Sequence, residues 1–190
     1  MTAGTNPQAI IRRMQRVPMA QFEPALKKRL EDLWGEPPNL YRGLGNHPKL
    51  AGAWTEFSRT LRHDTRTPRD LRELVILRGA QLMRSEYEWA QHLRMARKAG
   101  VPEEQIAALA DWRASDEFTE KEKAALGLAE AVTQGRVSDE VYAQAMRHFD
   151  HHDYVELALV AAFYAMVARM LDAMGVQLEP DMRNHSPRLP

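Results

Sequence analysis

Apolar residues recur every three or four positions along most of this sequence, the spacing that gives a helix one apolar face. The stretch 50–62 shows it clearly, with Trp54, Phe57 and Leu61 at helical intervals. The longest apolar run without a charged residue, Leu157–Ala168, has twelve residues. A membrane-spanning helix needs about 20, so this run indicates a buried core helix. The pattern predicts an all-α protein of about eight helices without strands.

Capping residues, glycines and prolines set the expected ends of the helices. Thr67 is expected to be an N-cap with Pro68 at the first helical position, and Asp153 is expected to cap the long apolar helix. Two pairs match a capping box, Ser85 with Glu88 and Thr119 with Glu122. The expected helices cover residues 23–34, 50–62, 68–83, 85–100, 102–113, 119–134, 138–149 and 153–174, with a loop at 39–48.

The chain divides by pattern into three parts. Residues 1–65 form an expected N-terminal helical extension, residues 66–176 an expected helical core, and residues 177–190 an expected loose tail that contains three prolines. A length of 190 residues suits one domain with an extension. Residues 1–20 lack the apolar run of a signal peptide, so a cytoplasmic protein with no membrane attachment is expected.

Composition excludes several classes of chemistry. The 26 basic and 26 acidic residues balance, which argues against a nucleic-acid-binding protein. The chain has no cysteine, so it can hold no disulfide, thiolate metal site, cysteine nucleophile or dithiol redox couple. The sequence also lacks the nucleophile elbow, the phosphate-binding loop, the dinucleotide fingerprint and the zinc-protease motif.

The window 72–100 carries the strongest candidate chemistry. Glu88 and His92 are four residues apart, so they share one helix face. Glu73 would lie about 28 Å from His92 in one continuous helix, but a break before Ser85 lets the two helices fold back on each other. Two carboxylates and an imidazole would then form a group able to transfer protons.

The same residues also have purely structural interpretations. Glu88 can serve as the capping-box partner of Ser85. A Glu–His pair four residues apart is common on exposed helices, and Glu73 can form a solvated ion pair with Arg72 or Arg78.

A second cluster, His148, His151 and His152 with two aspartates, could bind a divalent metal ion. A solvated loop before the long apolar helix explains this cluster more simply. No metal site is therefore expected.

The window resembles the carboxymuconolactone decarboxylase and alkylhydroperoxidase D superfamily. The superfamily pattern is an Arg-Glu-Leu helix, a break, and a helix with a His followed by Ala-x-x-x-Gly. Arg72-Glu73-Leu74, His92 and Ala96 to Gly100 match it in order and spacing. The resemblance implies the alkylhydroperoxidase D-like helical fold, with the family core in residues 66–176. It also implies a homo-oligomer, a trimer or a hexamer.

The two branches of the superfamily imply different reactions. In the peroxidase branch two cysteines occupy the positions of Ser85 and Glu88, and the proton relay maps onto Glu73, His92 and Tyr87. Cysteine-dependent peroxidase activity is rejected because neither thiol is present. The decarboxylase branch commonly has an acid at the position of Glu88, but it differs from this chain at Glu73 and Ser85. The chain thus combines the Glu73 of one branch with the Glu88 of the other.

The sequence and the resemblance together predict a cofactor-independent lyase, a decarboxylase of a small organic acid or lactone. His92 is the expected general acid or base, Glu88 is expected to orient it or to shuttle the proton, and Glu73 completes the relay. Residues expected to contact the substrate are Ser85, Tyr87, Trp89 and Tyr164. Tyr41, His47 and Trp54 of the N-terminal extension could also reach the pocket. The alternative is a non-catalytic oligomeric protein that binds a small molecule on the same fold.

Overall fold

A computed structural model describes residues 16–18, 21–183 and 189, and these residues form helices without strands. The all-α prediction is confirmed. The helices are α1 Pro24–Trp34, α2 Asn39–Leu44, α3 Pro48–His63, α4 Arg69–Met83, α5 Glu86–Ala99, α6 Glu103–Ala108, a 3₁₀ turn Leu109–Asp111, α7 Glu120–Gln134, α8 Asp139–Met146, α9 His151–Met174 and α10 Pro180–Arg183.

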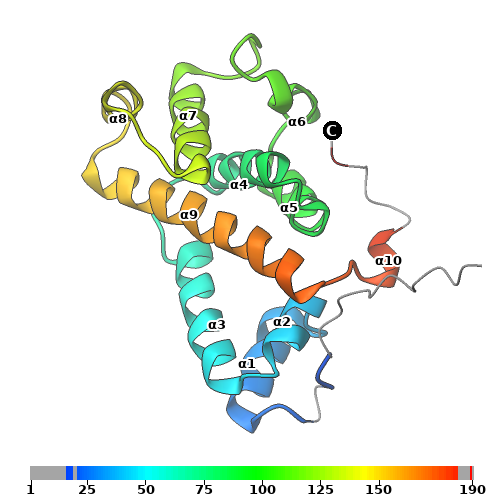
Figure 1. The fold of residues 1–190 in the computed structure, drawn as a ribbon. Coiled ribbons are helices and arrows are strands. Elements are labelled where there is room, and N and C mark those ends of the chain that lie inside the picture. The colour runs from blue at the N-terminus through cyan, green and yellow to red at the C-terminus, as the bar shows by residue number, and fades with distance from the viewer. Residues whose placement is uncertain (1–15, 19–20, 184–188, 190) are drawn as a thin grey trace, which may run out of the picture.

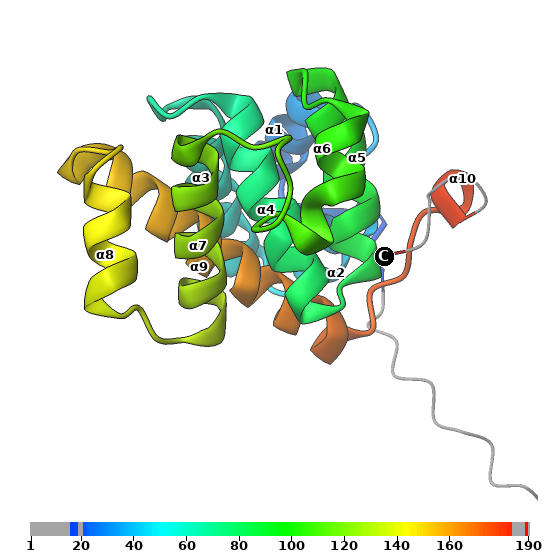
Figure 2. The same cartoon turned by 90° about the horizontal axis from the view of Figure 1, so that it is seen from above.

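Helix α9 lies between two groups of helices (Figure 1). On one side it packs against α4, α5 and α7, and on the other it contacts α3 of the N-terminal group. Helices α8 and α10 lie at opposite ends of the molecule (Figure 2). Helix α9 is long and apolar enough to cross a membrane, but half of its apolar stretch is buried within the protein. Its packing is that of the predicted core helix.

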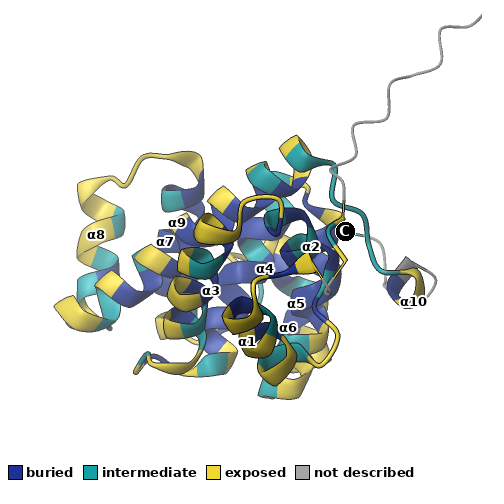
Figure 3. Cartoon of the chain, turned by 90° about the horizontal axis from the view of Figure 1, so that it is seen from below, coloured by how far each residue is buried: buried dark blue, intermediate teal, exposed yellow. Residues whose placement is uncertain are grey.

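Helix α4 forms the centre of the molecule (Figure 3). Its consecutive apolar residues 74–77 are all buried, because α5, α7 and α9 cover it on different sides. Arg84 ends the helix in the left-handed conformation, with a φ of 52° and its N–H directed at the carbonyls of the last turn. This turn reverses the chain, so α5 packs back along α4. The predicted break before Ser85 is confirmed.

Several predicted helix ends were wrong. The segment expected to be a loop contains α2, whose buried Tyr41 packs against the apolar face of α1. The Thr67 side chain does not cap α4, which begins at Arg69. Helix α9 begins at His151 because Asp150, not Asp153, accepts the cap hydrogen bond, and its donor is the N–H of Asp153. The Thr119–Glu122 capping box is present as predicted.

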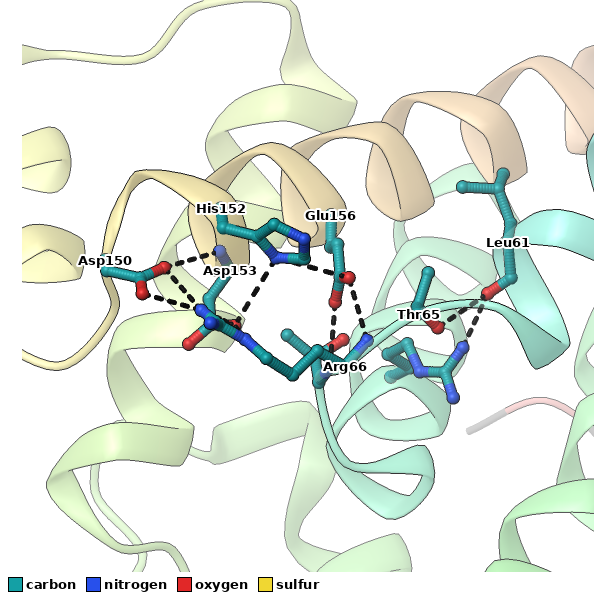
Figure 4. Close-up of polar contacts among 9 residues, drawn as sticks. Leu61, Thr65, Arg66, Asp150, His152, Asp153 and Glu156 are labelled. Atoms are coloured by element: carbon teal, nitrogen blue, oxygen red, sulfur yellow. Dashed lines mark hydrogen bonds and ion pairs between the residues drawn. The ribbon is translucent and has the colours of Figure 1, made fainter.

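The loop between α3 and α4 is bound to the first turns of α9 (Figure 4). The Glu156 carboxylate accepts the backbone N–H groups of Arg66 and Thr67, both at 2.8 Å. The Arg66 guanidinium donates to Asp150 at 2.6 Å and to Asp153 at 2.9 Å. These contacts fix where α4 begins relative to α9, and therefore help to place Glu73, one turn into α4.

The three-histidine cluster does not form one site. His152, Asp153 and Glu156 have ligand atoms within 4.8 Å of one another, whereas His148 and His151 do not belong to this group. Arg66 and the backbone donors of its loop already use the two carboxylates. This arrangement favours an ion-pair network over a metal site.

Glu156→Gln is expected to lower the free energy of unfolding by about 1–3 kcal/mol, because an amide NH₂ would face one of the two backbone N–H donors. Chemical denaturation measures the change. The control is Asp172→Asn on the exposed face of the same helix, expected to stay within about 0.5 kcal/mol. Equal stabilities for the two variants would contradict this role of Glu156.

The segment after α9 contacts both the N-terminal helices and α5. The Glu179 carboxylate accepts hydrogen bonds from the Asn39 N–H at 2.7 Å, the Tyr87 hydroxyl at 2.8 Å and the Gln91 amide at 2.8 Å. Residues 177–183 are therefore anchored rather than loose, since three buried donors need an acceptor there. The rest of the expected tail lies outside the described residues except for Leu189.

Candidate active site

The reversal between α4 and α5 brings Glu73 and His92 together. His92 Nδ1 lies 2.7 Å from Glu73 Oε2, and both side chains are buried, with exposed fractions of 0% for Glu73 and 6% for His92. The other oxygen of Glu73 forms an ion pair with Arg69, one turn earlier on α4. The sequence placed the pair on facing helices, and the structure shows direct contact.

The surroundings of Glu73 favour its charged form. Burial raises the pKa of this carboxyl, but the hydrogen bonds and charges of His92 and Arg69 outweigh burial and lower the pKa below its usual value. An ionised Glu73 accepts a proton-bearing Nδ1, which fixes the orientation of the ring. The Nε2 nitrogen is then the one left for a substrate.

Glu88 lies one turn before His92 on α5 in a very different environment. Its exposed fraction is 2%, and neither carboxyl oxygen has a hydrogen-bond partner in the described part of the chain. Burial without a compensating charge raises the pKa of Glu88 well above its usual value. Burial therefore favours the protonated form of Glu88, whereas the partners of Glu73 favour its ionised form.

The structural alternatives for these residues do not hold. Ser85 is the N-cap residue of α5, but its side chain makes no cap hydrogen bond, and Glu88 does not reach back to it. The Glu88–His92 pair is buried rather than exposed. Glu73 does not form the expected solvated ion pair, because its side chain is inaccessible to solvent. Glu73, not Glu88, contacts the imidazole and orients it.

Glu88 and His92 line one small, mainly apolar cavity of about 50 Å³. The cavity lies between α5, α9 and the N-terminal helices, and its lining residues are Trp34, Pro38, Leu40, Tyr41, Trp54, Ser58, Arg62, Tyr87, Glu88, Gln91, His92, Met95, Phe163, Tyr164, Val167 and Leu171. This volume holds only a few water molecules, and ligand pockets are usually about 300–1,000 Å³. A ligand of ordinary size would therefore have to displace some of the lining side chains.

Two of the four residues expected to contact the substrate line the cavity. The Tyr164 ring packs edge-on against the His92 ring, with ring centroids 4.6 Å apart. Burial raises the pKa of the Tyr164 hydroxyl. The Tyr87 hydroxyl donates to Glu179 and accepts the Leu40 N–H at 3.3 Å, so existing bonds hold it. Burial and then the Glu179 charge raise the pKa of Tyr87.

The other two expected contacts do not line the cavity. Trp89 packs into a separate core cluster with Leu74 and Leu93, because the residue after Glu88 points about 100° away around the helix. Ser85 is the N-cap residue of α5, two residues before Tyr87, where the cavity-lining part of the helix begins. Neither residue lines this cavity, and contact of either one with a substrate stays a prediction.

Sequence reasoning also missed residues of the lining. The structure adds Arg62 and Ser58 of α3, which are four residues apart on one face, and Gln91 and Met95 of α5, which have the same spacing. Of the three N-terminal residues considered from the sequence, Tyr41 and Trp54 line the cavity. The third, His47, instead accepts the Leu50 N–H at the start of α3.

Solved structures with the same fold cover nearly the whole chain. One is an alkylhydroperoxidase D core, an uncharacterised peroxidase-related protein from Ralstonia eutropha JMP134, with a TM-score of 0.75 and 20% identity over 90% of this chain and 94% of that one. Another is a cysteine-to-alanine variant of the debrominase Bmp8 in complex with 2,3,4-tribromopyrrole, with a TM-score of 0.76 and 22% identity over 95% and 97%. The fold is thus the predicted alkylhydroperoxidase D-like fold.

Sequence comparison defines the family. Residues 48–131 match the carboxymuconolactone decarboxylase family, a region that contains Glu73, Glu88 and His92. The uncharacterised protein YdfG of Bacillus subtilis is 36% identical over 110 residues, which are 56% of this chain and 75% of YdfG. The chain belongs to the carboxymuconolactone decarboxylase family, as a cysteine-free member. Tyr41 and Tyr164 of the cavity lie outside the matched region.

Proposed function

We propose that this chain is a cofactor-independent acid–base enzyme, a lyase that decarboxylates a small organic acid or lactone. The observation that carries the proposal is the contrast between two buried carboxyl groups near His92, because Glu73 is bound to the imidazole and to Arg69 whereas Glu88 has no partner among the described residues. These surroundings lower the pKa of Glu73 and raise that of Glu88, so they favour a charged Glu73 and a neutral Glu88. Environments that push two pKa values apart in this way assign the acid and the base of a site.

The chemistry needs one proton donor beside the substrate. In a decarboxylation the carbon–carbon bond to the substrate carboxylate breaks and CO₂ leaves. The electron pair of that bond passes into a neighbouring carbonyl group, and the resulting enolate then takes up one proton. Glu88 holds such a proton in the cavity. A protonated His92 ring would donate its Nε2–H to the enolate oxygen, and Glu73, bound to Nδ1, would stabilise the charge of that ring. Solvent returns the proton to Glu88 after turnover. No step uses a thiol, which agrees with the absence of cysteine.

A test is CO₂ release from a panel of β-keto acids and carboxylated lactones. We expect the wild-type protein to release CO₂ from a member of the panel and His92→Gln to be slower by about 100-fold or more. His151→Gln, at the exposed start of α9, is the matched control and should keep the wild-type rate. An equal rate for His92→Gln, or no release by the wild type above that of buffer, would overturn the proposal.

The small cavity favours a second candidate, a non-catalytic oligomeric protein that binds a small molecule. The ligand that Bmp8 binds, 2,3,4-tribromopyrrole, is a suitable apolar probe of the aromatic lining. Binding of this probe by a protein that decarboxylates no panel member would support the second candidate. Inhibition of CO₂ release by the same probe would support the lyase.

A homo-oligomer also remains a proposal. Val155, Leu159 and Met166 are exposed along one side of α9, and Phe57 of α3 is a further exposed apolar residue. An apolar stripe of this kind is suited to a second copy of the chain. Light scattering that gives the mass of a trimer or hexamer would support this state, and a monomer mass would contradict it.

A further inference from the structure

A second, wider cleft opens beside the cavity. Its volume is about 480 Å³, and five of its lining residues are basic or imidazole side chains. They are Arg62, His63, Arg69, Arg72 and Lys98. No acidic residue lines it, and its remaining lining residues are apolar or aromatic. The cleft is therefore a region of positive charge in a chain whose total net charge is zero.

The cleft and the cavity share Trp34, Arg62 and Met95. Arg62 donates to the Tyr41 hydroxyl at 3.1 Å and to Ser58 Oγ at 3.3 Å, and its guanidinium lies 5.0 Å from the centre of the Trp34 ring. Within the described residues no carboxylate lies in ion-pair distance of Arg62. A half-buried cation thus separates the two spaces, and the charge of Glu73 acts on it from beyond ion-pair distance.

Two further cations of the cleft, Lys98 and Arg72, are also incompletely neutralised. Lys98 and Arg72 form no ion pair with the parts of the chain that the structure describes, and Arg72 donates only to the Leu61 carbonyl, at 2.5 Å. Burial and then the charge of Arg69 lower the pKa of Arg72, and the charges of Glu156 and Glu73 offset only part of this lowering. Arg69 pairs with Glu73, so the cleft ends at the proton relay itself.

We infer that this cleft binds an oxyanion, and that Arg62 holds it at the entrance to the cavity. The inference rests on the proposed function, in which the oxyanion is a carboxylate of the substrate. A planar guanidinium is suited to a carboxylate because it can donate two parallel hydrogen bonds. Lys98 adds the positive potential that attracts an anion to the entrance. Movement of Arg62 and Trp34 toward the ligand would join the small cavity to the wider cleft.

Calorimetric titration with succinate, and separately with inorganic phosphate, tests the inference at low ionic strength. We expect the wild type to bind succinate, and both Arg62→Gln and Lys98→Gln to bind it about 10-fold more weakly or worse. The Lys98 side chain is exposed and forms no hydrogen bond or ion pair with a described residue, so the Lys98→Gln protein should fold normally. Arg94→Gln is the matched control, because it removes an exposed charge of the same helix outside the cleft.

No binding by the wild type, or equal weakening by Arg94→Gln, would overturn the inference. Binding of phosphate without succinate would contradict the carboxylate as the natural group. These results are independent of turnover, so the two proposals can fail separately. If His92→Gln stops CO₂ release while succinate binding is absent, only the cleft assignment fails. If succinate binds as predicted while no acid is decarboxylated, only the lyase assignment fails.

Discussion

Glu73→Gln is expected to reduce the turnover number for CO₂ release by about 10²–10⁴-fold, the usual contribution of positioned acid–base groups. The amide can still accept a hydrogen bond from His92, but it carries no charge to stabilise a protonated ring or to neutralise Arg69. Steady-state kinetics on the substrate found with the panel measures the loss. The loss should fall on kcat with little change in KM, because Glu73 does not line the cavity.

Glu86→Gln is the matched control for this change. Glu86 is exposed on the first turn of α5 and lies outside the cavity, so its variant should keep the wild-type kcat. Circular dichroism of both variants checks that they fold. A folded Glu73→Gln protein with the kcat of the control would remove Glu73 from the relay.

Glu88→Gln is expected to stabilise the protein at high pH and to inactivate it. The pKa of Glu88 is raised in the folded state, so the fold binds a proton that the unfolded chain releases above about pH 4.3. Stability is therefore full below that pH and falls as the pH rises through the folded-state pKa. The fall amounts to about 1.4 kcal/mol for each unit by which the pKa is raised. Glutamine removes this loss but has no proton to transfer.

Thermal unfolding at about pH 5 and about pH 8 measures the effect. The Tm of Glu88→Gln should exceed that of the wild type, and the difference should be larger at the higher pH. Glu86→Gln, whose side chain is exposed, should show no such trend. A pH-independent difference for Glu88→Gln would mean that Glu88 is already ionised in the fold.

The sequence predicted the parts of the fold that depend on local pattern. The spacing of apolar residues located α4, α5 and α9, and the break before Ser85 placed Glu73 opposite His92. The resemblance named the fold and the family correctly. These features follow from helix periodicity, from a chain reversal and from a short motif, and all three are visible in one sequence.

Features that depend on tertiary packing were not predicted. Helix α2 is short and carries a glycine, and the burial of Tyr41 against the first helix stabilises it. The sequence analysis did not single out Arg62, because only the packing of α1 and α2 places Trp34 and Tyr41 beside its guanidinium. Ser85 and Glu88 matched a capping box, but burial of Glu88 in the cavity overrides that local preference.

The central claim is that Glu73 and Glu88 have opposite ionisation states on either side of His92. The most direct measurement is ¹³C NMR of protein labelled at the glutamate side-chain carboxyl carbon, with the two resonances assigned from Glu73→Gln and Glu88→Gln. At about pH 7 the account predicts a carboxylate signal for Glu73 and a carboxylic acid signal for Glu88. A carboxylate at both positions would contradict it.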